Sequence, residues 1–197
     1  LKAELVVIDS DVLAQGFDCV VPDFAGGISQ ATRELKARYE RVGMIAGQES
    51  TTDGTPVTDE REAAFERELG AAFNPAWLKV GDYSEQSGYH QMQELLALPQ
   101  ENRPEAILIA NDVMAIGALR ALHEAQVQIP AEMALVAFND TSIARYMYPP
   151  LTAIRVPTEQ MAAMGVNLLQ QRLTVSNLAP QRVVVGTSLI KRQSTEI

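Results

Sequence analysis

The chain has 197 residues, of which 47% are hydrophobic and 21% are charged, which is ordinary for a soluble globular protein that buries a sizeable core. Its net charge of −9 and its lack of a basic run argue against nucleic-acid binding by this chain itself. The single cysteine, Cys19, excludes an intrachain disulfide and favours a cytoplasmic location, and no apolar run is long enough to span a membrane.

Short apolar strands alternate with segments of helical periodicity over the first 138 residues. In chain order, the pattern predicts strands at 5–9 and 18–22, a helix at 28–39, a strand at 42–47, a helix at 64–72, a strand at 77–80, a helix between Ser84 and Pro99, a strand at 106–110, a helix at 112–125 and a strand at 134–138. This order predicts an α/β fold with a parallel sheet.

The pattern changes after Asp140, where no clear alternation of helix and strand continues. Prolines make residues 148–157 extended. One helix follows, with Met161 and Leu168 on one side, and a single strand is predicted at 183–190. A lone helix without its own strand suggests that the chain leaves one sheet, visits another and returns.

An Asn-Asp pair follows each of two neighbouring strands, in AILIAND and in ALVAFND. Parallel strands end at the same edge of a sheet, and this carboxyl edge is where open α/β sheets bind ligands. The amides of Asn111 and Asn139 suit a hydroxyl-rich, uncharged ligand. Helix capping is the alternative, since Asn and Asp are both good N-caps. Capping is the expected role of Asp112, whereas for Asn111 the parallel with Asn139 favours binding.

Two further side chains are predicted near that edge. Arg61 opens the helix after the strand at 42–47, so it can bind a hydroxyl pair or a carboxylate, or form a surface ion pair with neighbouring acids. Tyr83 follows the strand at 77–80, so its ring can stack on a sugar or simply pack. His90 and His123 lie on predicted helices away from the edge, and we expect no functional role for them.

Enzyme and nucleotide-binding motifs are absent: there is no G-x-S-x-G, G-x-G-x-x-G, Walker loop or H-E-x-x-H. Acids in the polar loop after residue 47 and at the start of the following helix (Asp53, Asp59, Glu60 and Glu62) are more consistent with a solvated face than with a metal site. The sequence therefore predicts no catalysis, no cofactor and no metal.

The segment from Ile107 to Leu169 carries an ordered set of motifs: A-N-D after a strand, M-A-x-G, I-P, V-A-F-N-D and P-P-L-T-A-I-R. This set resembles the effector-binding domain of lactose/galactose-repressor-type (LacI/GalR) transcriptional regulators. Weaker matches extend the resemblance over nearly the whole chain. Among the branches of the family, A-F-N-D with T-S-I-A-R-Y-M-Y-P-P-L-T-A-I-R is most similar to repressors of β-galactosidase operons.

The resemblance implies a periplasmic-binding-protein-like architecture, in which two Rossmann-like, parallel-sheet subdomains are joined by three crossovers. It assigns residues 1–22 and 155–184 to an incomplete N-terminal subdomain, and residues 23–154 and 185–197 to the C-terminal subdomain. The DNA-binding headpiece is expected to lie outside this chain, so operator DNA would be bound only through that headpiece.

Carried over position by position, the effector-contacting residues implied by the resemblance are Arg61, Tyr83, Asn111, Asn139 and Thr158. Asn139 stands where Asp is more usual, so one carboxylate acceptor is replaced by an amide. Thr158 stands where some members have an aromatic residue in the cleft. The effector implied is a sugar or a galactoside.

A dimer surface is predicted on the helix at 112–125 and on the loop IARYMYPPL. The helix is apolar over more than one face, which indicates burial on two sides, and the loop adds large apolar residues. The resemblance places a two-fold contact at these two segments, with Ile116 and Met147 on contact positions. Leu119 and Tyr146 are added as interface residues because they belong to the same apolar surface. The alternative is that this surface covers its own domain.

The expected function is the effector-binding and dimerisation region of a cytoplasmic transcriptional repressor, in which sugar binding changes operator affinity. A periplasmic sugar-binding protein of a transport system, with the same architecture, is the main alternative. A sugar-processing enzyme is the third and is disfavoured, because no base or nucleophile is found at the predicted edge.

Overall fold

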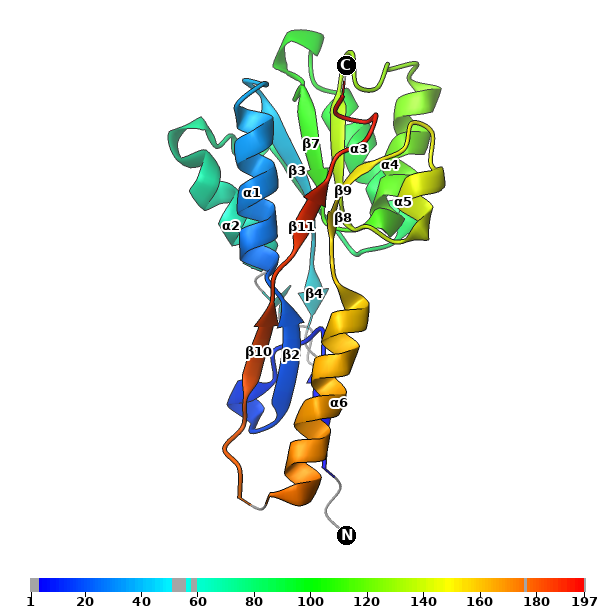
Figure 1. The fold of residues 1–197 in the computed structure, drawn as a ribbon. Coiled ribbons are helices and arrows are strands. Elements are labelled where there is room, and N and C mark those ends of the chain that lie inside the picture. Colours follow the sequence, from blue (N-terminus) through cyan, green and yellow to red (C-terminus); the bar gives the residue numbers. More distant parts are fainter. Residues whose placement is uncertain (1–3, 51–55, 58–59, 176, 197) are drawn as a thin grey trace. The chain divides into compact units, whose positions relative to one another are not determined.

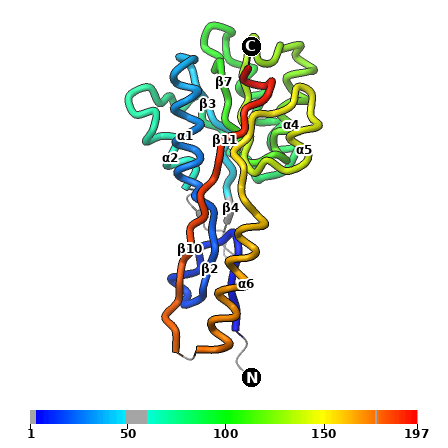
Figure 2. Tube along the Cα trace, in the orientation of Figure 1, coloured from blue at the N-terminus to red at the C-terminus, as the bar shows by residue number. Residues whose placement is uncertain are grey.

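The computed structural model describes residues 4–50, 56–57, 60–175 and 177–196. The chain divides into two compact units, one formed by Leu1–Asp23 with Val156–Thr187 and the other by Phe24–Arg155 with Ser188–Ile197. The chain therefore passes three times from one unit to the other, as the trace in Figure 2 lets the reader follow.

The smaller unit is built on a three-stranded parallel sheet in the order β1-β2-β10. It consists of β1 (Val6–Ile8), the short 3-10 turn η1 (Leu13–Gln15), β2 (Asp18–Pro22), α6 (Thr158–Thr174) and β10 (Arg182–Val185). Every residue of the central strand β2 is buried, because α6 packs against both β1 and β2 (Figure 1).

The central strand of this unit begins with a buried charge. The Asp18 side chain is bound by Arg172 of α6, whose Nη2 lies 2.6 Å from Oδ1, and the backbone N–H of Gln181 donates to the same oxygen at 2.6 Å. The hydrogen bonds from Arg172 hold the pKa of Asp18 below its ordinary value. This carboxylate therefore joins β2, α6 and the residue before β10.

The larger unit contains a six-stranded sheet in the order β11-β9-β8-β7-β3-β6, which is parallel except for the antiparallel pair β11 and β9. Its strands are β3 (Val42–Gly47), β6 (Leu78–Gly81), β7 (Ala106–Ile109), β8 (Ala134–Asn139), β9 (Thr152–Arg155) and β11 (Ser188–Ile190). A separate antiparallel pair is formed by β4 (Glu49–Ser50) and β5 (Pro56–Val57).

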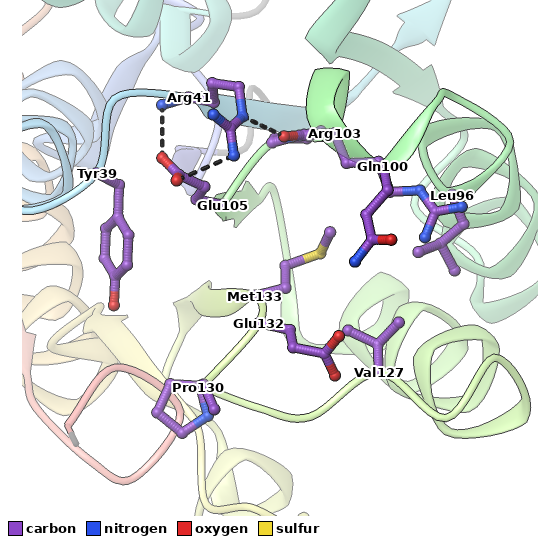
Figure 3. Close-up of a pocket in the computed structure, with 12 residues that line it drawn as sticks. Tyr39, Arg41, Leu96, Gln100, Arg103, Glu105, Val127, Pro130, Glu132 and Met133 are labelled. Carbon is purple, nitrogen blue, oxygen red and sulfur yellow. Dashed lines mark hydrogen bonds and ion pairs between the residues drawn. The ribbon is translucent and has the colours of Figure 1, made fainter.

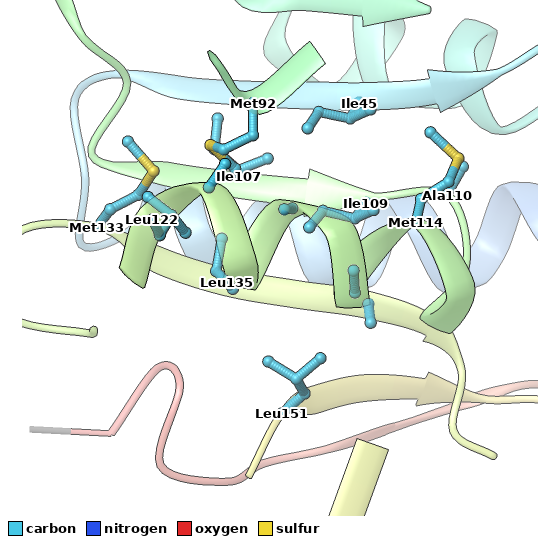
Figure 4. Packing of buried hydrophobic residues seen from close by; sticks show 14 of the residues in the cluster. Ile45, Met92, Ile107, Ile109, Ala110, Met114, Leu122, Met133, Leu135 and Leu151 are labelled. Carbon is cyan, nitrogen blue, oxygen red and sulfur yellow. The ribbon is translucent and has the colours of Figure 1, made fainter. Parts of the chain in front are cut away.

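Helices cover this sheet. They are α1 (Phe24–Lys36), α2 (Glu60–Leu69), α3 (Glu85–Leu96), α4 (Asp112–Glu124) and the short α5 (Ser142–Tyr146), with 3-10 turns η2 (Gly70–Ala72), η3 (Pro75–Trp77) and η4 (Gln100–Asn102). Helices α1 and α2 pack on each other, and α3 packs on α4 (Figure 1). Figure 4 shows the core between α4 and the strands, where Met92, Ile107, Ile109 and Leu135 gather, all of them buried.

Two glycines allow α3 and α4 to approach closely. A Cβ atom on Gly117 would lie 1.8 Å from the carbonyl oxygen of Glu85, and one on Gly88 would lie 2.1 Å from that of Met114. Each is a contact with backbone, which cannot turn aside as a side chain does. The second side of α4 is therefore covered in part by α3 of the same chain.

Most of the predicted elements are confirmed, including the α/β class, the capping of α3 by Ser84 and the end of that helix before Pro99. Two predictions are wrong. Residues 183–190 do not form one strand, because the chain breaks at Gly186 into β10 and β11, which belong to different sheets. Residues 142–146 also form a helix, α5, where the sequence analysis predicted a loop.

Candidate functional site

The carboxyl edge of the six-stranded sheet brings three of the predicted site residues into contact. Asn111 follows β7, and its Oδ1 accepts a hydrogen bond from the backbone N–H of Met114 at 2.7 Å. Its Nδ2 donates to the carbonyl oxygen of Tyr83 at 3.2 Å, and so joins the end of β7 to the end of β6. The prediction that Asp112 caps α4 is wrong, because Asn111 is the N-cap and Asp112 is the first helical residue.

Arg61 connects the same two strand ends from α2. Its Nη1 donates to the carbonyl oxygen of Ala110 at 3.0 Å, and its Nη2 donates to the hydroxyl of Tyr83. A guanidinium holds several hydrogen-bond partners in one plane. Arg61, Tyr83 and Asn111 therefore form one hydrogen-bonded group at the sheet edge.

Three aromatic rings surround the Arg61 guanidinium. Its Cζ atom lies 5.0 Å from the centre of the Phe24 ring, 5.1 Å from that of Tyr83 and 5.6 Å from that of Phe138. Phe24 and Phe138 also stack, with ring centres 5.8 Å apart. Cation–π contact of this kind holds a guanidinium in place and reduces its contact with water. We call Arg61, Phe24, Tyr83 and Phe138 the arginine cage.

Sequence reasoning missed the two phenylalanines of the cage. Phe138 reads as an ordinary buried strand residue, and only its place directly before Asn139 indicated the sheet edge. Phe24 begins α1, and no pattern in the sequence links residues 24 and 61. The contact depends on the packing of α1 beside α2, which periodicity does not reveal.

Three residues on two loops of this edge have positive φ angles, which residues other than glycine rarely adopt. The φ angle is 66° at Tyr83, 104° at Asn139 and 56° at Asp140. Such conformations cost free energy and persist only where the surroundings enforce them, and they are concentrated at functional sites. Beside Tyr83, the backbone N–H and the hydroxyl of Ser84 both donate to Asp82 Oδ1, so hydrogen bonds hold the turn on both sides of Tyr83. Hydrogen bonds from Ser84 and Ser87 also lower the pKa of Asp82 to about 2.

The turn after β8 is held by a buried carboxylate. The Asp140 side chain has no exposed area and forms ion pairs with Arg155 Nε at 2.7 Å and with Arg192 Nη2 at 2.6 Å. Arg155 ends β9, and Arg192 follows β11. These ion pairs fix the residue next to Asn139, the fourth predicted residue at this edge. Among the described residues, the Asn139 amide forms no hydrogen bond with Arg61, Tyr83 or Asn111.

The remaining predicted residues lie elsewhere. Thr158 belongs to the smaller unit, where it is the exposed first residue of α6. Ile116 lies on α4 and Tyr146 ends α5, with 36% and 87% of their surfaces exposed. Leu119 and Met147 are half-buried and pack against the core of the larger unit.

A pocket of about 270 Å³ lies at the opposite, amino edge of the same sheet (Figure 3). Its charged groups are paired inside the protein: Arg41 Nη2 lies 3.0 Å from Glu105 Oε1, and Arg41 Nε donates to the Arg103 carbonyl oxygen at 2.7 Å. None of the predicted site residues lines this pocket. We therefore place the candidate site at the carboxyl edge.

Metal and membrane features are not found in the described part of the chain. No group of three or more His, Cys, Asp or Glu side chains there is arranged to hold a metal ion. Asp53 and Asp59, two of the acids considered above, lie outside the described residues. Among the described helices, none is long and apolar enough to cross a membrane.

Comparison with known proteins identifies the family. Residues 32–195 match the model of the periplasmic binding protein-like domain. The chain is 36% identical over 201 residues to the HTH-type transcriptional regulator GalR of Streptococcus thermophilus, covering all of the chain and 60% of that protein. It is 41% identical over 188 residues to the HTH-type transcriptional repressor MelR of Bacillus subtilis, covering 91% of the chain and 53% of that protein.

Solved structures give the same assignment. The structure of the transcriptional regulator CelR in complex with cellobiose aligns with a TM-score of 0.83 and 30% identity, over 96% of this chain and 58% of that one. The chain thus spans between half and two thirds of the length of these proteins. It belongs to the periplasmic binding protein-like domain family, and it corresponds to the effector-binding region of LacI/GalR-type transcriptional regulators.

Proposed function

We propose that this chain binds a neutral sugar at the carboxyl edge of the six-stranded sheet and thereby controls a transcriptional repressor. The observation that carries the proposal is the hydrogen-bonded group of Arg61, Tyr83 and Asn111, to which the first turn of α2 and the ends of β6 and β7 each contribute one side chain. A structure that holds three such side chains together at a ligand-binding edge is suited to recognising several groups of one small molecule.

The chemistry of the edge favours a sugar. The half-buried rings of Phe24 and Tyr83 offer an apolar face for a pyranose ring, and the guanidinium and amides offer hydrogen bonds to its hydroxyls. Asn139 contributes an uncharged amide where a carboxylate is usual in the family, so the edge suits a neutral ligand. CelR, whose structure contains cellobiose, supports the same ligand class.

The wider assignment follows from the relatives, which are transcriptional regulators. We infer a cytoplasmic, non-catalytic protein in which the two compact units are the two subdomains. Thr158 stays a sugar-contacting residue predicted from the family resemblance alone. Operator DNA would be bound by a headpiece outside this chain, since a net charge of −9 opposes binding by the chain itself. The ligand changes operator affinity by binding one conformational state more tightly than another.

Titration calorimetry with a panel of mono- and disaccharides that includes galactose and cellobiose tests the proposal. We expect at least one sugar to bind, and Arg61→Gln to weaken that binding roughly tenfold or more, as the loss of a charged hydrogen bond predicts. The matched control is Arg120→Gln, which changes a largely exposed arginine on α4 and should leave the affinity unchanged. No binding by any sugar, or equal effects of the two variants, would contradict the proposal.

A further inference from the structure

Asp112 is a buried acid on α4 whose carboxyl group binds Thr141, outside its own helix. The residue is 1% exposed, and its Oδ2 accepts hydrogen bonds from the backbone N–H of Thr141 at 2.6 Å and from the Thr141 hydroxyl at 2.7 Å. Thr141 is the residue directly before α5. One carboxylate oxygen therefore ties the first turn of α4 to the turn that follows β8.

The second carboxylate oxygen differs from the first. Oδ1 of Asp112 is buried and has no hydrogen-bond partner among the described residues. An acid kept in such a place is costly, because a buried carboxylate oxygen normally finds a donor. A residue needed only to fill space or to begin the helix would not require this carboxyl group, since Asn111 already provides the cap.

We propose that Asp112 is a positioning residue that fixes the turn at residues 139–141, and through it both Asn139 of the sugar site and the start of α5. The part concerning the sugar rests on the function proposed above. The turn needs such a restraint, because Asn139 and Asp140 have φ angles of 104° and 56°. The Asp140 ion pairs with Arg155 and Arg192 hold its near end, and Asp112 holds its far end through Thr141.

Because the surroundings of Asp112 shift its pKa, this residue makes the stability of the folded chain depend on pH. The pKa of Asp112 is raised, mainly because the carboxyl group is buried and also because Asp140 is nearby. The hydrogen bonds from Thr141 and the charge of Arg192 oppose this shift but are outweighed. The folded chain therefore binds this proton more tightly than the unfolded chain does. The stabilising contribution is complete below the ordinary pKa of 3.8 and is lost as the pH rises through the raised value.

Two substitutions test whether Asp112 positions the turn at residues 139–141 or only fills space in the core. Asp112→Asn keeps an oxygen that can accept from Thr141 and removes the charge, so the turn should stay fixed and the pH dependence from this group should disappear. Asp112→Ala removes the acceptor, so the backbone amide of Thr141 should exchange with solvent at least tenfold faster. Amides of β3, which lies between β7 and β6, provide the control in the same spectrum, and their exchange should not change.

Amide hydrogen exchange followed by NMR on the ligand-free protein is therefore the decisive measurement. Unchanged exchange at Thr141 in Asp112→Ala, with β3 still protected, would overturn the proposal. If that variant does not fold, Thr141→Val replaces it, because the loss of the hydroxyl bond alone should speed exchange at residues 140 and 141 severalfold, and no increase would overturn the proposal equally.

Calorimetry with galactose and cellobiose separates this inference from the proposed function. Lower affinity in Asp112→Ala with rescue in Asp112→Asn is expected if both hold. If neither sugar binds the unaltered protein while exchange at Thr141 responds as described, the positioning role stands and the assignment of a sugar ligand fails. Equal affinity in the unaltered protein and in folded Asp112→Ala overturns the role of Asp112 in the sugar site.

Discussion

The Asn111 side chain is engaged at both ends of its amide inside the protein, yet it retains capacity for a ligand. Its oxygen caps α4 and its nitrogen donates to Tyr83. An amide oxygen accepts two hydrogen bonds and an amide nitrogen donates two, so one position of each kind is left. Capping and binding, which appeared as alternatives in the sequence, are therefore compatible roles of one residue.

Replacing Asn111 by Ser and by Ala separates the two roles. Both variants lose the hydrogen bond to the Tyr83 carbonyl oxygen, but Ser can still cap the helix, so the free energy of unfolding should be about 1 kcal/mol higher for Asn111→Ser than for Asn111→Ala. Urea unfolding measures both. Sugar affinity should fall in both variants, because neither has the amide, and full affinity in Asn111→Ser would show that Asn111 acts only as a cap.

For individual residues, the sequence predicted which side chains meet at the carboxyl edge of the sheet better than it predicted the role of each side chain. Asn111, Arg61 and Tyr83 could be placed together because each follows a strand of a parallel sheet, and strand ends meet at one edge. The capping role was assigned to the wrong member of the Asn-Asp pair, because either residue type can cap and only the backbone decides. The contact of Phe24 with Arg61 depends on tertiary packing that leaves no local pattern.

Among the elements, the close packing of α3 on α4 depends on the two glycines at their contact, of which Gly117 makes the closer approach. A methyl group on Gly117 would meet the backbone of Glu85 at 1.8 Å, so the two helices would have to separate. Gly117→Ala should therefore destabilise the protein by about 1–3 kcal/mol or more, despite the better helix propensity of alanine. Chemical unfolding provides the measurement.

Gly165 of α6 is the matched control, because it is also helical and a Cβ atom there would meet the end of the Ile8 side chain at 3.0 Å. That side chain can adjust, so Gly165→Ala should be close to neutral. Equal destabilisation by the two substitutions would mean that the close approach of α3 and α4 is not what Gly117 provides.

The elements that the sequence analysis missed are too short to show a repeating pattern of apolar residues. Helix α5 has five residues, little more than one turn, so no apolar repeat develops. Strands β10 and β11 are separated only by Gly186 and Thr187, and their shared β-branched and apolar composition resembles one strand. Which sheet each half joins is decided by partners distant in sequence.

For the whole molecule, exposed apolar residues on α4 and around α5 indicate an interface. Ile143, Tyr146 and Tyr148 are exposed, and Ile116 is 36% exposed on the neighbouring helix. We predict an isologous dimer through this surface, in which the double substitution Ile116→Lys with Met147→Lys places like charges opposite each other. Sedimentation should show a monomer, with a circular dichroism spectrum that is unchanged.

The control for the dimer is Leu173→Lys, which places the same charge at another exposed apolar residue, on α6. It should leave the dimer intact. A dimer that survives the double substitution on α4 and α5 would place the interface elsewhere. Part of α4 is covered by α3 of the same chain, which agrees in part with the alternative that the sequence left open for this surface.

Binding of a sugar at the carboxyl edge of the six-stranded sheet can be located by amide NMR during titration with a sugar from the calorimetry panel. We predict that the largest chemical-shift changes occur at Tyr83, at Asn111 and at residues 139–141. Changes concentrated instead around Arg103 and Glu132, which line the pocket at the amino edge (Figure 3), would contradict it.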